Sequence, residues 1–130
     1  MGLELVSVIV KEYDEAIDFF VNVLRFVLED DSPSLDGDGE PKRWVVVRAP
    51  GAGCGVLLAE ARGEEQEALV GRQFAGRVGL FLRVDDFYES YTHMTESGVE
   101  FLTEPRTEAY GHVAVFKDLY GNKWDLLGAA

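Results

Sequence analysis

The chain has 130 residues, of which 47% are hydrophobic and 28% are charged. This composition is typical of one globular domain of ordinary size, and it excludes intrinsic disorder. The single cysteine, Cys54, excludes an intramolecular disulfide and a cysteine-based zinc site, and it fits a reducing cytoplasm. No stretch approaches the ~20 apolar residues that a membrane-spanning helix needs.

The charge is strongly one-sided, with 24 acidic and 12 basic side chains and a net charge of −12. Phosphate backbones and anionic lipids repel such a surface, which argues against nucleic-acid and membrane partners. A cationic small molecule would be attracted to it. The alternative is that the acidic surface serves solubility alone.

The first half of the chain predicts a strand, a helix and three further strands. A β-branched run ending at Val10 is typical of a strand over residues 3–10. Four apolar residues then recur at helical spacing, which predicts a helix over residues 12–24. They are Tyr13, Ile17, Phe20 and Leu24. The later strands are expected at residues 26–28, 44–47 and 55–61. The acidic, turn-rich segment Glu29–Glu40 predicts a solvated loop.

The second half repeats this order after a polar connector with room for a short helix. Its predicted elements are a strand over 78–84, a helix over 85–97, and strands over 99–102, 112–117 and 123–127. Val10 and the acidic residues after it superpose on Val84 and its followers, at an offset of 74 residues (84 − 10).

An internal repeat of this kind predicts one domain made of two similar modules. The expected parts are module 1–61, connector 62–76 and module 77–130. Each module offers a four-stranded sheet with a single helix to cover it, so one sheet face must find another partner. The predicted fold class is therefore α+β, with tandem βαβββ modules whose curled mixed sheets enclose a cleft.

Two segments carry a family resemblance. The helix Tyr13–Phe20 is followed by Leu24-Arg25-Phe26, and the chain ends with Asp118-Leu119-Tyr120-Gly121-Asn122 and then Asp125-Leu126. With the repeat, they make the chain resemble the vicinal oxygen chelate superfamily of glyoxalases, bleomycin-resistance proteins and extradiol dioxygenases. That family usually has glycine where this chain has Arg25, proline at Leu119 and glutamate at Asp125.

The resemblance implies four positions where the family's enzymes hold a divalent metal. They fall on Leu5, on Leu58 or Val56 (with Glu60 on the same strand face), on Gly79 and on Asp125. Leucine and glycine side chains cannot bind a metal, and zinc needs at least three protein ligands. We therefore expect no cofactor, and a divalent metal only if the chain is an enzyme of this family after all.

Alternation along the strands predicts which side chains face the cleft. The predicted ligand-binding residues are Phe81, Arg83, Tyr110, His112, Phe116 and Asp125. An aromatic wall with a few polar groups is typical of a small-molecule site. Each residue also has a simpler interpretation. Arg83 and Asp125 could form an ion pair across the sheet, His112 could lie at the surface, and the two phenylalanines could be ordinary core.

Two functions from different classes follow from the resemblance. The first is a glyoxalase/bleomycin-resistance-like protein that binds and sequesters a small organic molecule, cationic if the surface charge selects it, without metal. The second is a metal-dependent lyase or dioxygenase. A metal-independent enzyme using His112 and Arg83 is a third alternative, so whether the protein is an enzyme stays open. The family also implies a homodimer, in which Trp44 packs on the neighbouring subunit.

Overall fold

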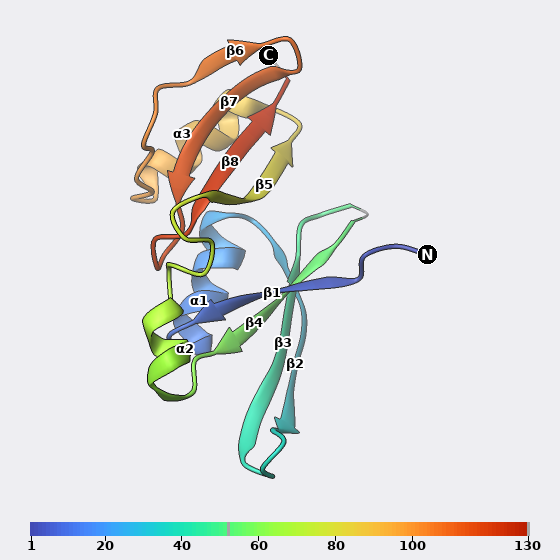
Figure 1. Cartoon of the computed structure of the whole chain (residues 1–130). Coiled ribbons are helices and arrows are strands. Elements are labelled where there is room, and N and C mark those ends of the chain that lie inside the picture. The colour runs from blue at the N-terminus through green and yellow to red at the C-terminus, as the bar shows by residue number, and fades with distance from the viewer. Residues whose placement is uncertain (52, 130) are drawn as a thin grey trace. The chain divides into compact units, whose positions relative to one another are not determined.

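The computed structural model describes residues 1–51 and 53–129. The chain divides into two compact units, Met1–Glu67 and Ala68–Ala130, and the boundary falls inside the predicted connector. Each unit contains a strand, a helix and three more strands in the same order, as the repeat predicts. Figure 1 shows the sheets, each with a helix against one face.

The first unit is built on the sheet β1-β4-β3-β2, in which β1 runs parallel to β4 and the other neighbours are antiparallel. The β2–β3 hairpin extends beyond the other two strands (Figure 1). Its elements are β1 (Leu5–Val10), α1 (Tyr13–Asp18), the π-helical turn η1 (Phe19–Val23), β2 (Val27–Leu35), β3 (Pro41–Arg48) and β4 (Gly55–Glu60).

The second unit repeats this topology as β5-β8-β7-β6, again with its first and last strands parallel. The predicted α+β fold with two mixed four-stranded sheets is thereby confirmed, and neither sheet closes into a barrel. Helix α2 (Gly63–Leu69) precedes this sheet. The remaining elements are β5 (Val78–Val84), α3 (Phe87–Glu96), β6 (Arg106–Glu108), β7 (Gly111–Lys117) and β8 (Lys123–Gly128).

The first helix begins as predicted but widens before it ends. Glu12 caps it, because its carboxylate accepts hydrogen bonds from the backbone N–H of Asp14 and Glu15 at 3.0 and 2.8 Å. After Asp18 the helix becomes π-helical, and the N–H of Leu24 reaches the carbonyl of Phe19. The extra residue per turn brings the adjacent Phe19 and Phe20 both into the core.

A buried carboxylate organises the turn between β7 and β8. Asp118 is only 8% exposed and accepts hydrogen bonds from the backbone N–H groups of Tyr120, Gly121 and Asn122, from the Asn122 amide and from the Trp124 indole. These bonds give the C-terminal motif a structural role. The motif fixes the turn and locks Trp124 beside the buried ring of Phe116.

Two predicted segments are wrong. The acidic segment Glu29–Glu40 is not a loop throughout, because β2 continues to Leu35 and pairs with β3 up to the turn. Its side chains are mostly exposed, since β2 is an edge strand, and this hid the strand in the sequence pattern. Residues 99–102 form only one bridge, Phe101 with Phe116, and the edge strand of the second sheet is β6 instead.

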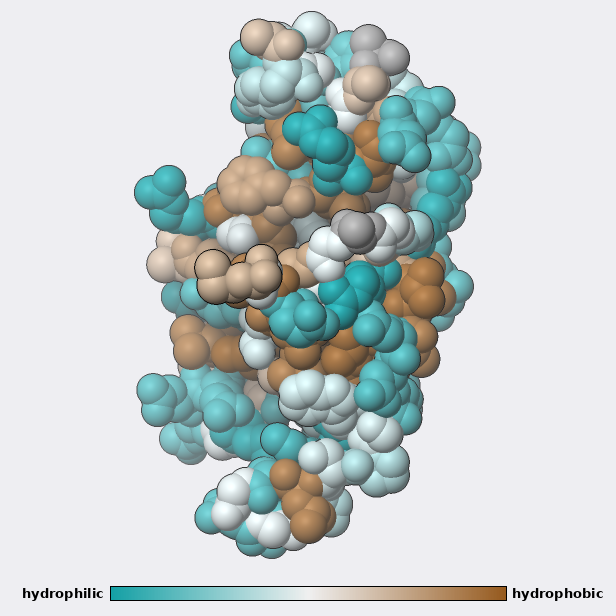
Figure 2. All heavy atoms as spheres, turned by 90° about the vertical axis from the view of Figure 1, so that its right-hand side faces the viewer, coloured by the Kyte–Doolittle hydropathy of each residue, from teal (hydrophilic) through white to brown (hydrophobic). Residues whose placement is uncertain are grey.

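Apolar side chains also lie at the surface. Figure 2 shows them in brown, interspersed with hydrophilic residues in teal on the face in view. Trp44 in the first unit and Phe81 and Tyr110 in the second are among the large apolar side chains that stay exposed. Of the helices in the part of the chain that the structure describes, none has the length and apolar character needed to cross a membrane.

Candidate functional site

Helix α3 packs on one face of the sheet of the second unit (Figure 1), and we call the opposite face the open face. Residues paired across neighbouring strands point to the same side of a sheet. Asp125 in β8 pairs with Phe81 in β5 and with Val115 in β7, and Arg83 pairs with Leu127. The structure therefore brings Phe81, Arg83 and Asp125 to one face, as the alternation predicts.

Asp125 places a carboxyl group on this open face. Its Oδ1 atom is buried and has no hydrogen-bond partner among the described residues. Burial raises the pKa of the Asp125 carboxyl above its ordinary value, and the positive charge of Arg106 offsets part of this rise. Beside it Phe81 is 63% exposed, so an apolar ring and a hydrogen-bond acceptor lie side by side.

Two of the predicted residues lie on the opposite face. Phe116 pairs with Trp124 and His112 pairs with Gly128, so both point toward α3. Phe116 is completely buried, and the His112 ring lies 5.4 Å from Phe87 and 5.0 Å from Tyr88. Placing His112 and Phe116 beside Asp125 is wrong, because alternation alone does not say which residue of β7 lies opposite Asp125.

Tyr110, the remaining predicted residue, lies at the surface, as does Arg83. Tyr110 is 53% exposed and directly precedes β7. Arg83 is also exposed, and no ion pair between it and Asp125 occurs in the described part of the chain. The ion-pair alternative is therefore wrong.

The strand register corrects one of the four metal-equivalent positions. Val10 pairs with Glu60 in the first unit, and the matching Val84 pairs with Gly128 in the second. Glu60 therefore matches Gly128. Leu57 precedes Glu60 by as many residues as Asp125 precedes Gly128 (60 − 57 = 128 − 125), so Leu57 matches Asp125. Leu58 and Val56 instead lie in the core, at 1% and 5% exposure. Glu60 shares their face of β4 and does not lie on the face of Leu57.

Gly79, the third of these positions, lies beneath an aromatic ring. A Cβ atom added there would fall 2.5 Å from Cδ1 of Phe74 and nearer still to two other carbons of that ring. The register between β5 and β8 also shifts at this point, between Val78 and Leu80. The Phe74 ring thus fills the space that a ligating side chain at position 79 would need.

The residues present do not fit the divalent metal of the family's enzymes. The first unit supplies Leu5 and Leu57 and the second supplies Gly79 and Asp125, so only one of the four positions carries a donor atom. Hard cations and zinc both need several protein ligands. Within residues 1–51 and 53–129, no cluster of three or more histidine, cysteine, aspartate or glutamate side chains could hold a metal ion.

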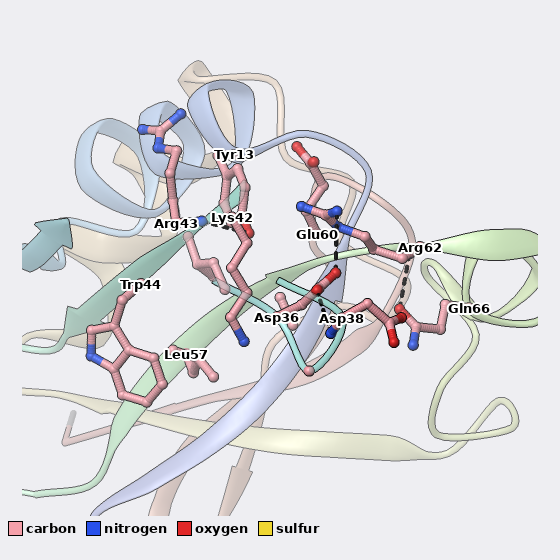
Figure 3. Close-up of a pocket in the computed structure, with 13 residues that line it drawn as sticks. Tyr13, Asp36, Asp38, Lys42, Arg43, Trp44, Leu57, Glu60, Arg62 and Gln66 are labelled. Atoms are coloured by element: carbon pink, nitrogen blue, oxygen red, sulfur yellow. Dashed lines mark hydrogen bonds and ion pairs between the residues drawn. The ribbon is translucent and has the colours of Figure 1, made fainter. Parts of the chain in front are cut away.

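The first unit contains a cavity of about 350 Å³ that the sequence analysis missed (Figure 3). Leu57 and Ala59 of β4 and Lys42 and Trp44 of β3 line it, and the hairpin turn at Asp36–Asp38 borders it. Arg62 fixes the turn, since its guanidinium donates to the carbonyl of Pro41 and lies 3.6 Å from Asp36. The alternation of Lys42, Trp44 and Val46 along a strand could have revealed this wall.

The comparisons with known proteins agree with this architecture. The model of the Glyoxalase/Bleomycin resistance protein/Dioxygenase superfamily matches residues 2–126. An uncharacterised protein of Shewanella frigidimarina is 50% identical over 123 residues, which cover 94% of this chain and 89% of the relative.

Two solved structures from Streptomyces sp. CB03234 are similar over nearly their whole length. One is TnmS3, described as an antibiotic-binding protein, with 28% identity, a TM-score of 0.79, and coverage of 100% of this chain and 97% of TnmS3. The other is described as a glyoxalase/bleomycin resistance protein, with 28% identity, a TM-score of 0.73, and coverage of 97% and 99%.

Proposed function

The chain belongs to the Glyoxalase/Bleomycin resistance protein/Dioxygenase superfamily, and from this premise we propose that it binds and sequesters a small organic molecule without the help of a metal ion. The observation that carries the proposal is that three of the four metal-equivalent positions have side chains that cannot bind a metal. Two are leucines, and the third is a glycine covered by Phe74. The similarity to the antibiotic-binding TnmS3 supports the same function class.

The open face of the second unit supplies the contacts that such a ligand needs. An apolar ring packs against Phe81, which is exposed, and a protonated amine or a hydroxyl group donates to the carboxylate of Asp125, whose side chain is partly exposed. The net charge of −12 favours a cationic ligand over a neutral one.

Location and assembly complete the proposal. We propose a cytoplasmic protein, in keeping with its single cysteine, and a homodimer, in keeping with its family. Light scattering on the eluate of a size-exclusion column measures the assembly directly: twice the mass of one chain supports the dimer, and the mass of one chain rules it out.

The test is a thermal-shift screen of chelator-treated protein against aromatic antibiotics, with metal-free bleomycin as the cationic member. Raised melting temperatures that are the same with and without added chelator support the proposal. Phe81→Ala and Asp125→Asn should both reduce the shift, whereas Tyr88→Ala, which removes an exposed ring from α3, should not. Ligand binding or turnover that appears only after a divalent metal is added would instead favour the lyase or dioxygenase.

A further inference from the structure

The cavity of the first unit is formed by other residues than the open face of the second unit and has its own chemistry. Side chains at alternate positions of β3 share one face, so Lys42, Trp44 and Val46 point to the same side of the sheet. Val46 pairs with Leu57 of β4, which places Leu57 on that side as well. The floor and one wall of the cavity are thus an aliphatic side chain and an indole.

The charged groups around the cavity are not equally available. Arg43 is held by Asp31 at 2.7 Å and Asp14 at 2.9 Å. Arg62 pairs with Asp36 across 3.6 Å. Lys42 also lines the cavity, and among the described residues its ammonium group forms no ion pair within 4 Å and no hydrogen bond, although the charge of Asp36 attracts it. Figure 3 shows it pointing toward the space between Leu57 and Asp36.

Three acidic side chains also line the cavity: Asp36, Asp38 and Glu60. Asp36 attracts Lys42, but its carboxylate accepts hydrogen bonds from the backbone N–H groups of Asp38 and Glu40 and pairs with Arg62. Glu60 lines the cavity too, but its side chain leaves β4 on the face opposite to Leu57 and Ala59. Asp38 is exposed at the tip of the hairpin turn, on the side of Gln66 and away from Trp44 (Figure 3). On the side of the indole, Lys42 is therefore the charged side chain that a ligand can meet without breaking an ion pair.

We propose that this cavity is a binding site for a flat aromatic compound that carries an anionic oxygen, a carboxylate or a phenolate. The aromatic ring lies against Trp44, which is 39% exposed, and Leu57. The anionic oxygen accepts a hydrogen bond from the Lys42 ammonium group. The cavity volume of about 350 Å³ is at the lower end of the range for small-molecule sites and suits a compound of two or three fused rings.

The proposal predicts that the cavity prefers an aromatic anion to an aromatic cation, although the protein as a whole is negatively charged. A chain of net charge −12 attracts cations in general, so selective binding of an aromatic anion requires a local cation. Two probes of one size test this: 2-naphthoate and 2-naphthylmethylamine, titrated calorimetrically into the full chain at moderate ionic strength. We expect 2-naphthoate to bind about tenfold more tightly.

Variants locate the binding. Lys42→Met should weaken 2-naphthoate binding about tenfold and abolish the preference, while Lys11→Met, which removes an equal charge from an exposed position outside the cavity, should not. Trp44→Leu should weaken both probes, because both lose the indole. Circular dichroism of each variant separates loss of binding from loss of fold.

Several results would overturn the inference. They are a preference for the amine, equal effects of Lys42→Met and Lys11→Met, or a Trp44→Leu variant that changes only the oligomeric state. Naphthoate binding that is lost in Phe81→Ala and kept in Trp44→Leu would also overturn it, while leaving the proposed binding function and its site in the second unit intact.

Discussion

Replacing Gly79 with alanine tests whether Phe74 occupies the third metal-equivalent position. The new Cβ would lie 2.5 Å from Cδ1 of Phe74, about 1 Å short of an ordinary carbon contact. Gly79 does not have a left-handed backbone conformation, so the overlap is the only source of strain. Overpacking of this kind costs about 1–3 kcal/mol in the free energy of unfolding.

A second variant separates the overlap from other effects. With Phe74→Ala in place, Gly79→Ala should cost little or stabilise the protein slightly, because alanine reduces the entropy of the unfolded chain. Gly37→Ala is the matched control, since a Cβ there meets nothing within 4 Å. Urea denaturation followed by circular dichroism and tryptophan fluorescence measures the stability of the parent protein and of the four variants (Gly79→Ala, Phe74→Ala, the double variant and Gly37→Ala). A cost for Gly79→Ala that is the same in both backgrounds would refute the account of this position.

Three further predictions concern stability. Asp118→Ala should lower the free energy of unfolding by about 3 kcal/mol or more, because donors buried in the turn lose their acceptor. An unchanged free energy of unfolding in urea denaturation would contradict the structural role of this carboxylate. Arg25→Gly should raise the free energy of unfolding by about 1 kcal/mol, because Arg25 has a φ of 62° and glycine adopts this conformation without steric cost. A lower free energy of unfolding in urea denaturation would mean that side-chain contacts of Arg25 outweigh the backbone strain. Because the pKa of Asp125 is raised, ionisation of its buried carboxyl should destabilise the fold increasingly as the pH rises from about 3.8 through the raised pKa. Thermal melts should therefore show that the stability of Asp125→Asn relative to the parent increases with pH. A relative stability that decreases with pH would contradict this.

Most of the architecture could be predicted from the sequence because its patterns are local. The period-two strands and the helical spacing after Tyr13 lie within single segments, and the offset between Val10 and Val84 shows that the pattern occurs twice. β2 could not be recognised, since its acidic residues face solvent and only pairing with β3 holds them in a strand. The π-helical turn also has no signature in a single sequence.

The candidate site was harder to predict, because it depends on register. The alternation of β8 correctly joins Asp125 to the side of Phe81, but only the pairing with β7 shows that Val115, and not Phe116, lies opposite. The same limit applies to Leu57, which a shift of one residue separates from Leu58. Phe74 lies in the connector, and its contact with Gly79 is a tertiary contact that no strand pattern contains.

Binding of metal ions to the chelator-treated protein tests the central claim most directly. Equilibrium dialysis against Zn²⁺, Ni²⁺, Mn²⁺ and Fe²⁺, each at micromolar concentration, with elemental analysis of the protein compartment, gives the number of ions bound per chain. Since only Asp125 among the four equivalent positions carries a donor, we predict far less than one ion per chain for every metal. One tightly held ion per chain that is lost in Asp125→Asn would contradict the account and would favour the family's metal-dependent chemistry.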